Sequence, residues 1–122
     1  MFTLPKKERI HGTQAVSRLL AKGRYGYHGA LKYCWLYPNG EEESRMMVSV
    51  SKRFFKRAVK RNLLKRRLRE SYRLQKDAFP SGLDIMFVYN TKEILESREI
   101  HALVGEIAEE LKTKVSSDAQ TV

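Results

Sequence analysis

The residues most able to do chemistry lie in one stretch, KRAVKRNLLKRRLRESYR, at positions 56–73. Together with the residues just before it, from Lys52 to Arg73, this part of the chain holds eleven Lys or Arg and one acid, Glu70. Arginine guanidinium groups match phosphate geometry, and an amide such as that of Asn62 can hydrogen-bond a sugar or a base. Binding of a polyanion, with release of its counterions, is therefore the chemistry that the stretch predicts.

The same stretch has the pattern of a helix with one basic face. At about 100° per residue and with Arg57 as zero, six polar residues fall between roughly 40° and 180°; they are Arg61, Lys65, Arg69, Asn62, Arg73 and Arg66. Two apolar groups flank this face: Leu64, Leu68 and Tyr72 near 0°, and Val59, Leu63 and Leu74 near 230° by the same ~100° rule. We expect both flanks to be embedded and the basic face to stay open.

A solvated surface helix is the ordinary explanation of a run of charges. Like charges four residues apart, such as Arg61, Lys65 and Arg69, repel each other by a few tenths of a kcal/mol per pair. Only Glu70 is available to offset that repulsion. Because a sequence shaped for stability alone would alternate bases with acids, the pattern favours an external anion.

Composition limits the remaining possibilities. The chain has 122 residues and a net charge of +10, and residues 52–76 alone contain twelve Lys or Arg and one acid. This predicts a single domain over residues 1–122 with a nucleic-acid face, an anionic membrane surface being the other possible target. The lone Cys34, the lack of a metal-site spacing and the absence of any signal-like or membrane-spanning apolar run favour a cytoplasmic protein without a membrane partner.

The elements predicted from periodicity support that reading. They are a helix over 13–22 ending at Gly23, strands over 31–37, 45–51 and 83–89, the basic helix, a helix over 97–114 and a frayed tail over 115–122. We expect the first two strands to pair as a hairpin and the mostly apolar third to be central. The order, helix, two or three strands, basic helix, strand, helix, predicts a two-layer α/β sandwich with one small mixed sheet covered by helices.

Aromatic residues alternate along the first predicted strand. Tyr33, Trp35 and Tyr37 fall on one side of it. Rings on an open sheet face can stack on unpaired bases. A small domain must also bury its tryptophan somewhere, so the core face of the sheet is an equally good explanation.

The run VSVSKRFFKRAVKRNLLKRRLRESYR, residues 48–73, resembles the signature of the bacterial ribonuclease P protein component. That signature is a strand ending in Ser-Lys-Lys/Arg, then Ala-Val-x-Arg-Asn-Arg-x-Lys-Arg-x-x-Arg-Glu on a helix. This chain supplies Ser51, Lys52, Arg53, Ala58, Val59, Arg61, Asn62, Lys65, Arg66, Arg69 and Glu70. The likeness extends in outline over residues 9–112, but only 48–73 is specific.

The resemblance implies a fold in which the basic helix joins two parallel strands by a left-handed crossover. It also implies a protein without catalytic residues, which binds no cofactor directly and serves a catalytic RNA that cuts precursor tRNA with Mg²⁺. That RNA would meet the basic helix, and the 5′ leader of precursor tRNA would lie between the sheet and the first helix. No obligate protein partner is implied.

Residue by residue, the resemblance carries over two sets of contacts. The RNA-binding set is Lys52, Arg53, Lys56, Arg57, Arg61, Asn62, Lys65, Arg66, Arg69 and Arg73. The leader cleft would contain Val16 and Leu20, where the family usually has phenylalanines, together with Tyr33 and Trp35. No residue is expected to ligate a metal ion.

One departure from the signature lies on the basic helix. Leu63 replaces the second Arg of Arg-Asn-Arg, while Arg67, four residues later, stands where the family is usually apolar. Positions four apart neighbour each other on a helix. We hypothesise that Arg67 restores the charge missing at Leu63.

Two other functional classes fit parts of the sequence. A nuclease acting alone would need His11, His28 or His101 as general acid or base, and each is isolated in the sequence. A structural or ribosomal RNA-binding protein without a role in cleavage would share the same charge pattern. A DNA-binding helix-turn-helix would need a second helix before the basic one, where a strand is predicted instead.

Overall fold

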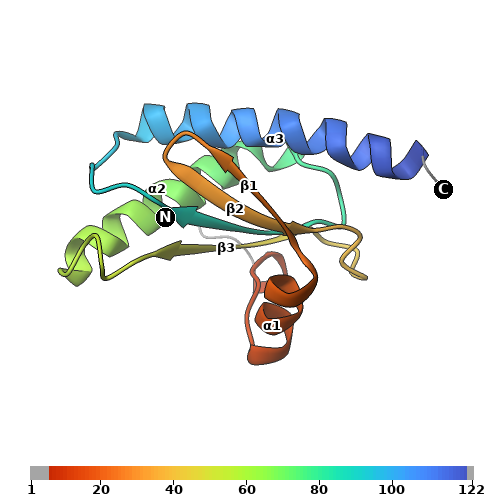
Figure 1. The fold of residues 1–122 in the computed structure, drawn as a ribbon, viewed down its shortest axis with the longest axis horizontal. Coiled ribbons are helices and arrows are strands. Elements are labelled where there is room, and N and C mark those ends of the chain that lie inside the picture. The colour runs from red at the N-terminus through yellow and green to blue at the C-terminus, as the bar shows by residue number, and fades with distance from the viewer. Residues whose placement is uncertain (1–5, 121–122) are drawn as a thin grey trace.

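The computed structural model describes residues 6–120. Its helices are α1 (Thr13–Lys22), α2 (Ala58–Gln75) and α3 (Ser97–Gln120), with short 3₁₀ turns at Lys6–Glu8 and Lys76–Ala78. Its strands are β1 (Arg24–His28), β2 (Leu31–Leu36), β3 (Arg45–Val50) and β4 (Asp84–Tyr89). Figure 1 shows α3 above the sheet and α1 below it. The predicted α/β sandwich with a small mixed sheet is confirmed.

The four strands lie in the order β1-β2-β4-β3. β2 is antiparallel to β1 and to β4, whereas β3 is parallel to β4, and α2 connects these two parallel strands. The apolar strand β4 is central, as predicted. The predicted hairpin between β2 and β3 is wrong, because β4 lies between them. A strand with apolar residues on both faces is most stable when both faces are covered, as in the centre of a sheet. This preference outweighs the tendency of strands that are close in sequence to pair.

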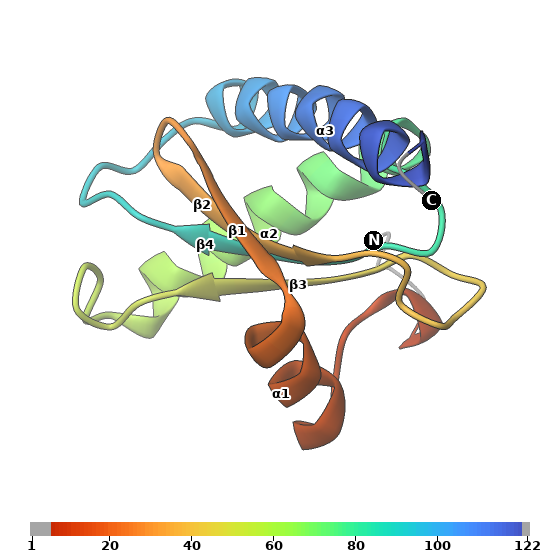
Figure 2. The same ribbon diagram turned by 45° about the vertical axis from the view of Figure 1, so that its right-hand side comes forward.

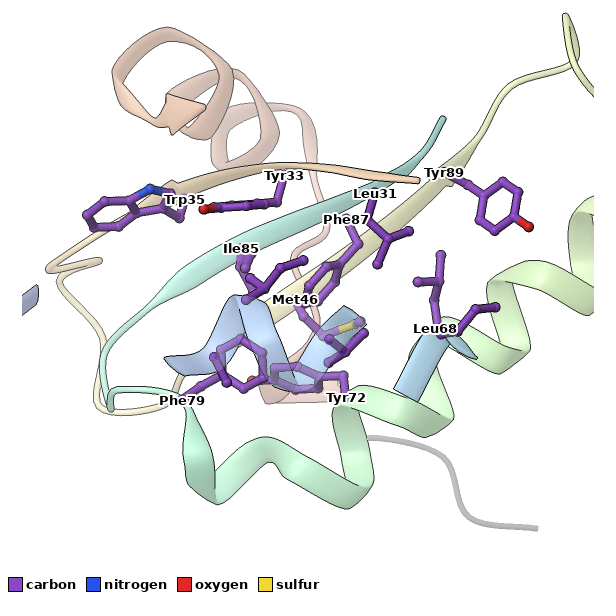
Figure 3. Packing of buried hydrophobic residues seen from close by; sticks show 14 of the residues in the cluster. Leu31, Tyr33, Trp35, Met46, Leu68, Tyr72, Phe79, Ile85, Phe87 and Tyr89 are labelled. Carbon is purple, nitrogen blue, oxygen red and sulfur yellow. The ribbon is translucent and has the colours of Figure 1, made fainter. Parts of the chain in front are cut away.

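The sheet is covered on both faces (Figure 2). α2 and α3 bury one face: Tyr33 and Trp35 of β2 and Ile85 and Phe87 of β4 pack in one cluster with residues of both helices. Figure 3 shows these side chains on the side of the sheet where Leu68 and Tyr72 of α2, and Phe79 after it, lie. α1 covers part of the other face through a smaller cluster of Ile10, Leu19 and Cys34.

Two glycines are required by close approach. Gly23 ends α1 as predicted, but its φ of −72° is open to any residue; a Cβ there would lie 2.4 Å from the Leu19 carbonyl oxygen and 2.6 Å from Cys34 Sγ. A Cβ on Gly26 would lie 2.5 Å from the ring of Tyr33. Both glycines let a backbone segment settle directly on β2.

The last helix is longer than its periodicity predicts. α3 runs to Gln120, beyond the expected end at Lys114, and Val115 is buried in the main cluster. The predicted tail over 115–122 is therefore helical as far as Gln120, and residues 121–122 lie outside the described part. The burial of Val115 stabilises the helix one residue beyond its predicted end.

A buried polar network fixes the loop between β2 and β3. Asp84 is almost fully buried and accepts hydrogen bonds from Arg45 Nε at 2.9 Å, Arg45 Nη2 at 2.7 Å and Asn39 Nδ2 at 2.8 Å. The hydrogen bond to Asp84 also raises the pKa of Arg45. Asn39 is fully buried and donates a second bond, of 3.0 Å, to the Glu43 carbonyl oxygen. One carboxylate thus ties the loop and the start of β3 to β4.

Replacing this carboxylate should cost a large part of the stability. In Asp84→Ala, Arg45 and Asn39 lose their buried acceptor, so we expect the free energy of unfolding to fall by about 3 kcal/mol. Urea denaturation measures it, with the exposed Asp77→Ala as the matched control. Equal losses in the two variants would show that the network contributes no more than a surface carboxylate.

Candidate nucleic-acid interface

α2 is buried along a single strip. Leu64, Leu68 and Tyr72 pack in the main core cluster, whereas Val59 and Leu74 are 78% and 60% exposed. The prediction that both apolar flanks are embedded is therefore wrong for the second flank. The sheet and α3 meet the helix from one side only, so one strip of α2 is all that they bury.

The basic face is made by a helix and by the loop before it. α2 begins at Ala58, so four of the predicted contact residues precede it: Lys52, Arg53, Lys56 and Arg57, all exposed. On the helix itself Asn62, Arg66 and Arg69 are exposed and Lys65 is half-buried. We call these eight residues the basic face. They extend from the loop after β3 along α2 as far as Arg69.

The start of α2 adds to the positive potential. Its N-cap residue, Arg57, makes no side-chain cap hydrogen bond, and the first turn has no acid. The partial positive charge of a helix N-terminus favours an anion there. The loop cations and the helix dipole therefore act at the same place.

Two predicted contact residues are held by protein atoms. Arg61 Nη1 donates to the carbonyl oxygens of Phe55 at 2.7 Å and Lys56 at 2.8 Å. Arg73 forms a hydrogen-bonded ion pair with Glu70, and this hydrogen bond lowers the pKa of Glu70. Arg61 thus holds in place the loop that carries Lys56, while Arg73 has part of its donor capacity taken by Glu70.

Arg67 also contacts the protein. Its guanidinium group donates a hydrogen bond to the carbonyl oxygen of Leu95, in the segment that leads into α3. Leu63, which precedes it by one turn, is half-buried. The geometry gives Arg67 a structural role between α2 and that segment, which differs from the charge replacement hypothesised from its spacing.

The predicted leader residues lie on opposite faces of the sheet. Val16 is half-buried and Leu20 is 44% exposed, and both belong to α1. Tyr33 and Trp35 are buried on the face covered by α2 and α3 (Figure 3). The prediction that these two rings line an open cleft is corrected, because a ring without exposed surface cannot stack on a base.

Alternation along β2 correctly placed Tyr33 and Trp35 on one side, but alternation does not tell which side is covered. The side facing α1 instead carries Lys32, Cys34 and Leu36. β1, which the sequence analysis leaves as an optional third strand, brings two exposed rings to that side, Tyr25 and Tyr27. The signal for β1 was present in the alternation of RYGYH, but five residues with a central glycine form a weak pattern.

The three histidines occupy three different settings. His28 lies between two glutamates of α3: its Nε2 is 3.2 Å from Glu106 Oε2 and its Nδ1 is 3.0 Å from Glu110 Oε2. His101 Nδ1 lies 3.3 Å from Gln75 Nε2. His11 lines a shallow hollow with Lys6, Lys7, Arg9, Arg45 and residues 41–43. None of these settings belongs to the basic face.

Other reactive or membrane features are limited in the described chain. Cys34 is buried, and this burial raises the pKa of its thiol. Over residues 6–120, His, Cys, Asp and Glu form no group of three that could hold a metal ion. No helix in that range combines the length and apolar character needed to cross a bilayer.

Comparison with known proteins identifies the family. The family model for ribonuclease P matches residues 4–112. The chain belongs to the ribonuclease P protein family. The ribonuclease P protein component of Porphyromonas gingivalis is 33% identical over 108 residues, which cover 85% of this chain and 69% of that protein. Membership implies a role in tRNA 5′ processing, as the protein component of an endoribonuclease complex that contains the ribonuclease P RNA.

Solved ribonuclease P proteins share the fold. The protein from Thermotoga maritima superposes with a TM-score of 0.74 at 23% identity, covering 84% of this chain and 96% of that one. A Staphylococcus aureus protein, described as a mutant with defective mRNA degradation activity, gives a TM-score of 0.76 at 22% identity over 88% of this chain and 90% of that one. The two-layer architecture is therefore that of bacterial ribonuclease P proteins.

The contact of Arg67 predicts a loss of stability more than a loss of RNA binding. In Arg67→Leu the Leu95 carbonyl loses a charged donor, which should lower the free energy of unfolding by roughly 1.5 kcal/mol. Arg66→Leu, one residue away and exposed, should change stability by less than about 0.5 kcal/mol and weaken RNA binding more. Denaturant unfolding and RNA titration of both variants measure this. If Arg67→Leu kept the wild-type stability but bound RNA much more weakly, the result would instead support the hypothesis that Arg67 replaces the charge missing at Leu63.

Proposed function

We propose that this chain binds the catalytic RNA of ribonuclease P through its basic face and the 5′ leader of precursor tRNA on the α1 side of the sheet. The RNA, with Mg²⁺, would cut the phosphodiester bond, and the protein would supply no catalytic residue. The observation that carries this proposal is the basic face itself: seven exposed or half-exposed cations and one amide on a loop and helix whose other side is held in the core.

The division of labour among the arginines supports an RNA partner. Arg61, Arg67 and Arg73 have protein contacts, while Arg66 and Arg69 point their charge outward with Asn62. Guanidinium groups contact phosphates in pairs of hydrogen bonds, and an amide between them can contact a sugar or base edge. A large folded RNA offers many phosphates at such spacing.

A role in Mg²⁺-dependent cleavage follows from charge. Bringing a precursor tRNA onto a catalytic RNA crowds two polyanions together, and this repulsion is relieved by metal ions or by protein cations. The seven cations of the basic face could replace part of that ionic requirement. We therefore infer that the protein matters most at low Mg²⁺.

Leader binding is placed on the α1 side because the other side is closed. Val16 and Leu20 of α1 and Lys32 of β2 border this face, and all three are partly or fully accessible. An extended single strand can lie on such a surface with its bases against apolar groups and its phosphates near a lysine.

A reconstituted cleavage assay tests the proposal. Precursor tRNA is incubated at low Mg²⁺ with the cognate RNA, with the protein, and with both. We expect cleavage to rise when the protein joins the RNA, and the double variant Arg66→Ala/Arg69→Ala to bind the RNA on the order of a hundredfold more weakly. Lys92→Ala/Lys112→Ala, which removes two exposed cations elsewhere, is the matched control.

The alternatives appear as distinct outcomes. Cleavage by the protein without the RNA would overturn the proposal in favour of a nuclease acting alone. Tight RNA binding with no effect on cleavage at any Mg²⁺ concentration would point to a structural RNA-binding protein. Equal RNA affinity for the two double variants would remove the basic face from the account.

A further inference from the structure

The part of the chain around α1 contains no carboxylate. Residues 9–40 hold five Lys or Arg and not one Asp or Glu; the five are Arg9, Arg18, Lys22, Arg24 and Lys32. The net charge of the whole chain does not reveal this segment, because acids elsewhere in the sequence offset its five cations. Arg24 lies over the Trp35 ring on the covered face of the sheet. The other cations of α1 and β2 give the segment a positive charge that is separate in sequence from the basic face and complementary to a polyanion.

Two tyrosines of β1 stand on this region. Tyr25 and Tyr27 are 51% and 63% exposed, and they pair in register with Cys34 and Lys32, which places them on the α1 side of the sheet. Lys32 Nζ lies 5.4 Å from the ring centroid of Tyr25 and 5.6 Å from that of Tyr27. We call Tyr25, Tyr27 and Lys32 the tyrosine platform. It combines two aromatic rings with a cation that they share.

The platform is held in place from several sides. The Tyr25 hydroxyl donates to the Leu20 carbonyl oxygen at 3.1 Å, which fixes that ring against the end of α1. Gly26, between the two tyrosines, rests on the buried ring of Tyr33. His28, which ends β1, lies between Glu106 and Glu110 of α3. These contacts fix the strand and the Tyr25 ring, so that ring has little conformational freedom left to lose on binding.

A continuous row of residues connects the platform with the opposite edge of the sheet. Tyr27, Lys32, Val88 and Ser49 are register partners across β1, β2, β4 and β3. Three strand spacings separate the two edges, roughly 14 Å in all. Soon after Ser49, β3 gives way to Lys52 and Arg53 of the basic face. A single strand several nucleotides long could therefore cross the sheet from the basic face to the platform.

We propose that the tyrosine platform is a distal binding site for the single-stranded leader of precursor tRNA. A leader base stacks on the exposed rings of Tyr25 and Tyr27, and Lys32 pairs with a flanking phosphate. The proposal rests on the proposed function and adds to it a site on β1, beyond α1. Single-stranded RNA fits better than an acidic protein segment, because every nucleotide offers a flat base together with a phosphate.

The dependence of affinity on leader length tests this binding site. Dissociation constants are measured for the complex of protein and catalytic RNA with a series of precursor tRNAs, from leaderless to leaders long enough to cross the sheet. Tyr27→Ala should weaken binding about tenfold for the long leaders only, since stacking on the ring is lost. Tyr27→Phe, which keeps the ring, should restore wild-type binding. Leu74→Ala, an exposed apolar residue on α2, is the control.

The outcomes separate this proposal from the one on which it rests. If the wild-type protein gives no gain in affinity for leaders over the RNA alone, leader binding itself fails. If the wild-type gain is present and Tyr27→Ala keeps it, only the platform is overturned. A loss of equal size for leaderless and long-leader substrates would also overturn it, because the platform would then contact the tRNA body, the catalytic RNA or a protein.

Discussion

The structure depends on the narrow strip by which α2 is packed into the core. Leu64, Leu68 and Tyr72 fill that strip and are almost wholly buried. Each such side chain contributes roughly 1.5 to 3 kcal/mol when removed from water. The repulsion among cations on the same helix costs only a few tenths of a kcal/mol per pair. Burial therefore outweighs repulsion, and it fixes the direction in which the exposed cations point.

The cations of the chain are divided between two tasks. Arg45, Arg61 and Arg67 hold protein segments together through Asp84 or backbone carbonyls, whereas the residues of the basic face remain available to an external partner. Three exposed acids, Glu99, Glu106 and Glu109, lie on α3, whereas the basic face contains none. This separation gives the molecule an electric asymmetry that can orient it as it approaches a polyanion. The acid-free segment over residues 9–40 extends the positive side beyond α2.

The sequence predicted the elements better than it predicted their neighbours. The basic helix, the short helix before Gly23 and the central position of β4 follow from local periodicity, and the structure confirms each of them. The pairing of β2 with β4 could not be derived in this way, since it depends on which strand gains most from burial on both faces. The same limit explains Tyr33 and Trp35: alternation puts them together, but only the position of α2 and α3 decides that their side is closed.

Spacing on the basic helix was similarly informative about faces and uninformative about contacts. A helical wheel puts Arg61 and Arg73 on the same polar side of the helix as Lys65 and Arg69. In the structure Arg61 instead binds carbonyl oxygens of the preceding loop, and Arg73 binds Glu70 one turn before it. The sequence pattern is helical from Lys56, whereas α2 begins at Ala58, because Lys and Arg are good helix formers and do not mark where a helix begins. The resemblance carries the loop's four cations, Lys52, Arg53, Lys56 and Arg57, over as RNA contacts, and all four are exposed.

The salt dependence of affinity for the catalytic RNA tests the central claim, that the buried strip of α2 turns the basic face toward phosphates. Log affinity is plotted against log salt concentration for the wild-type protein, Arg69→Ala and Arg67→Ala. We expect the slope to fall by about 1 in magnitude for Arg69→Ala, one phosphate contact being lost, and to stay unchanged for the protein-bound Arg67→Ala. An unchanged slope for Arg69→Ala would contradict the account.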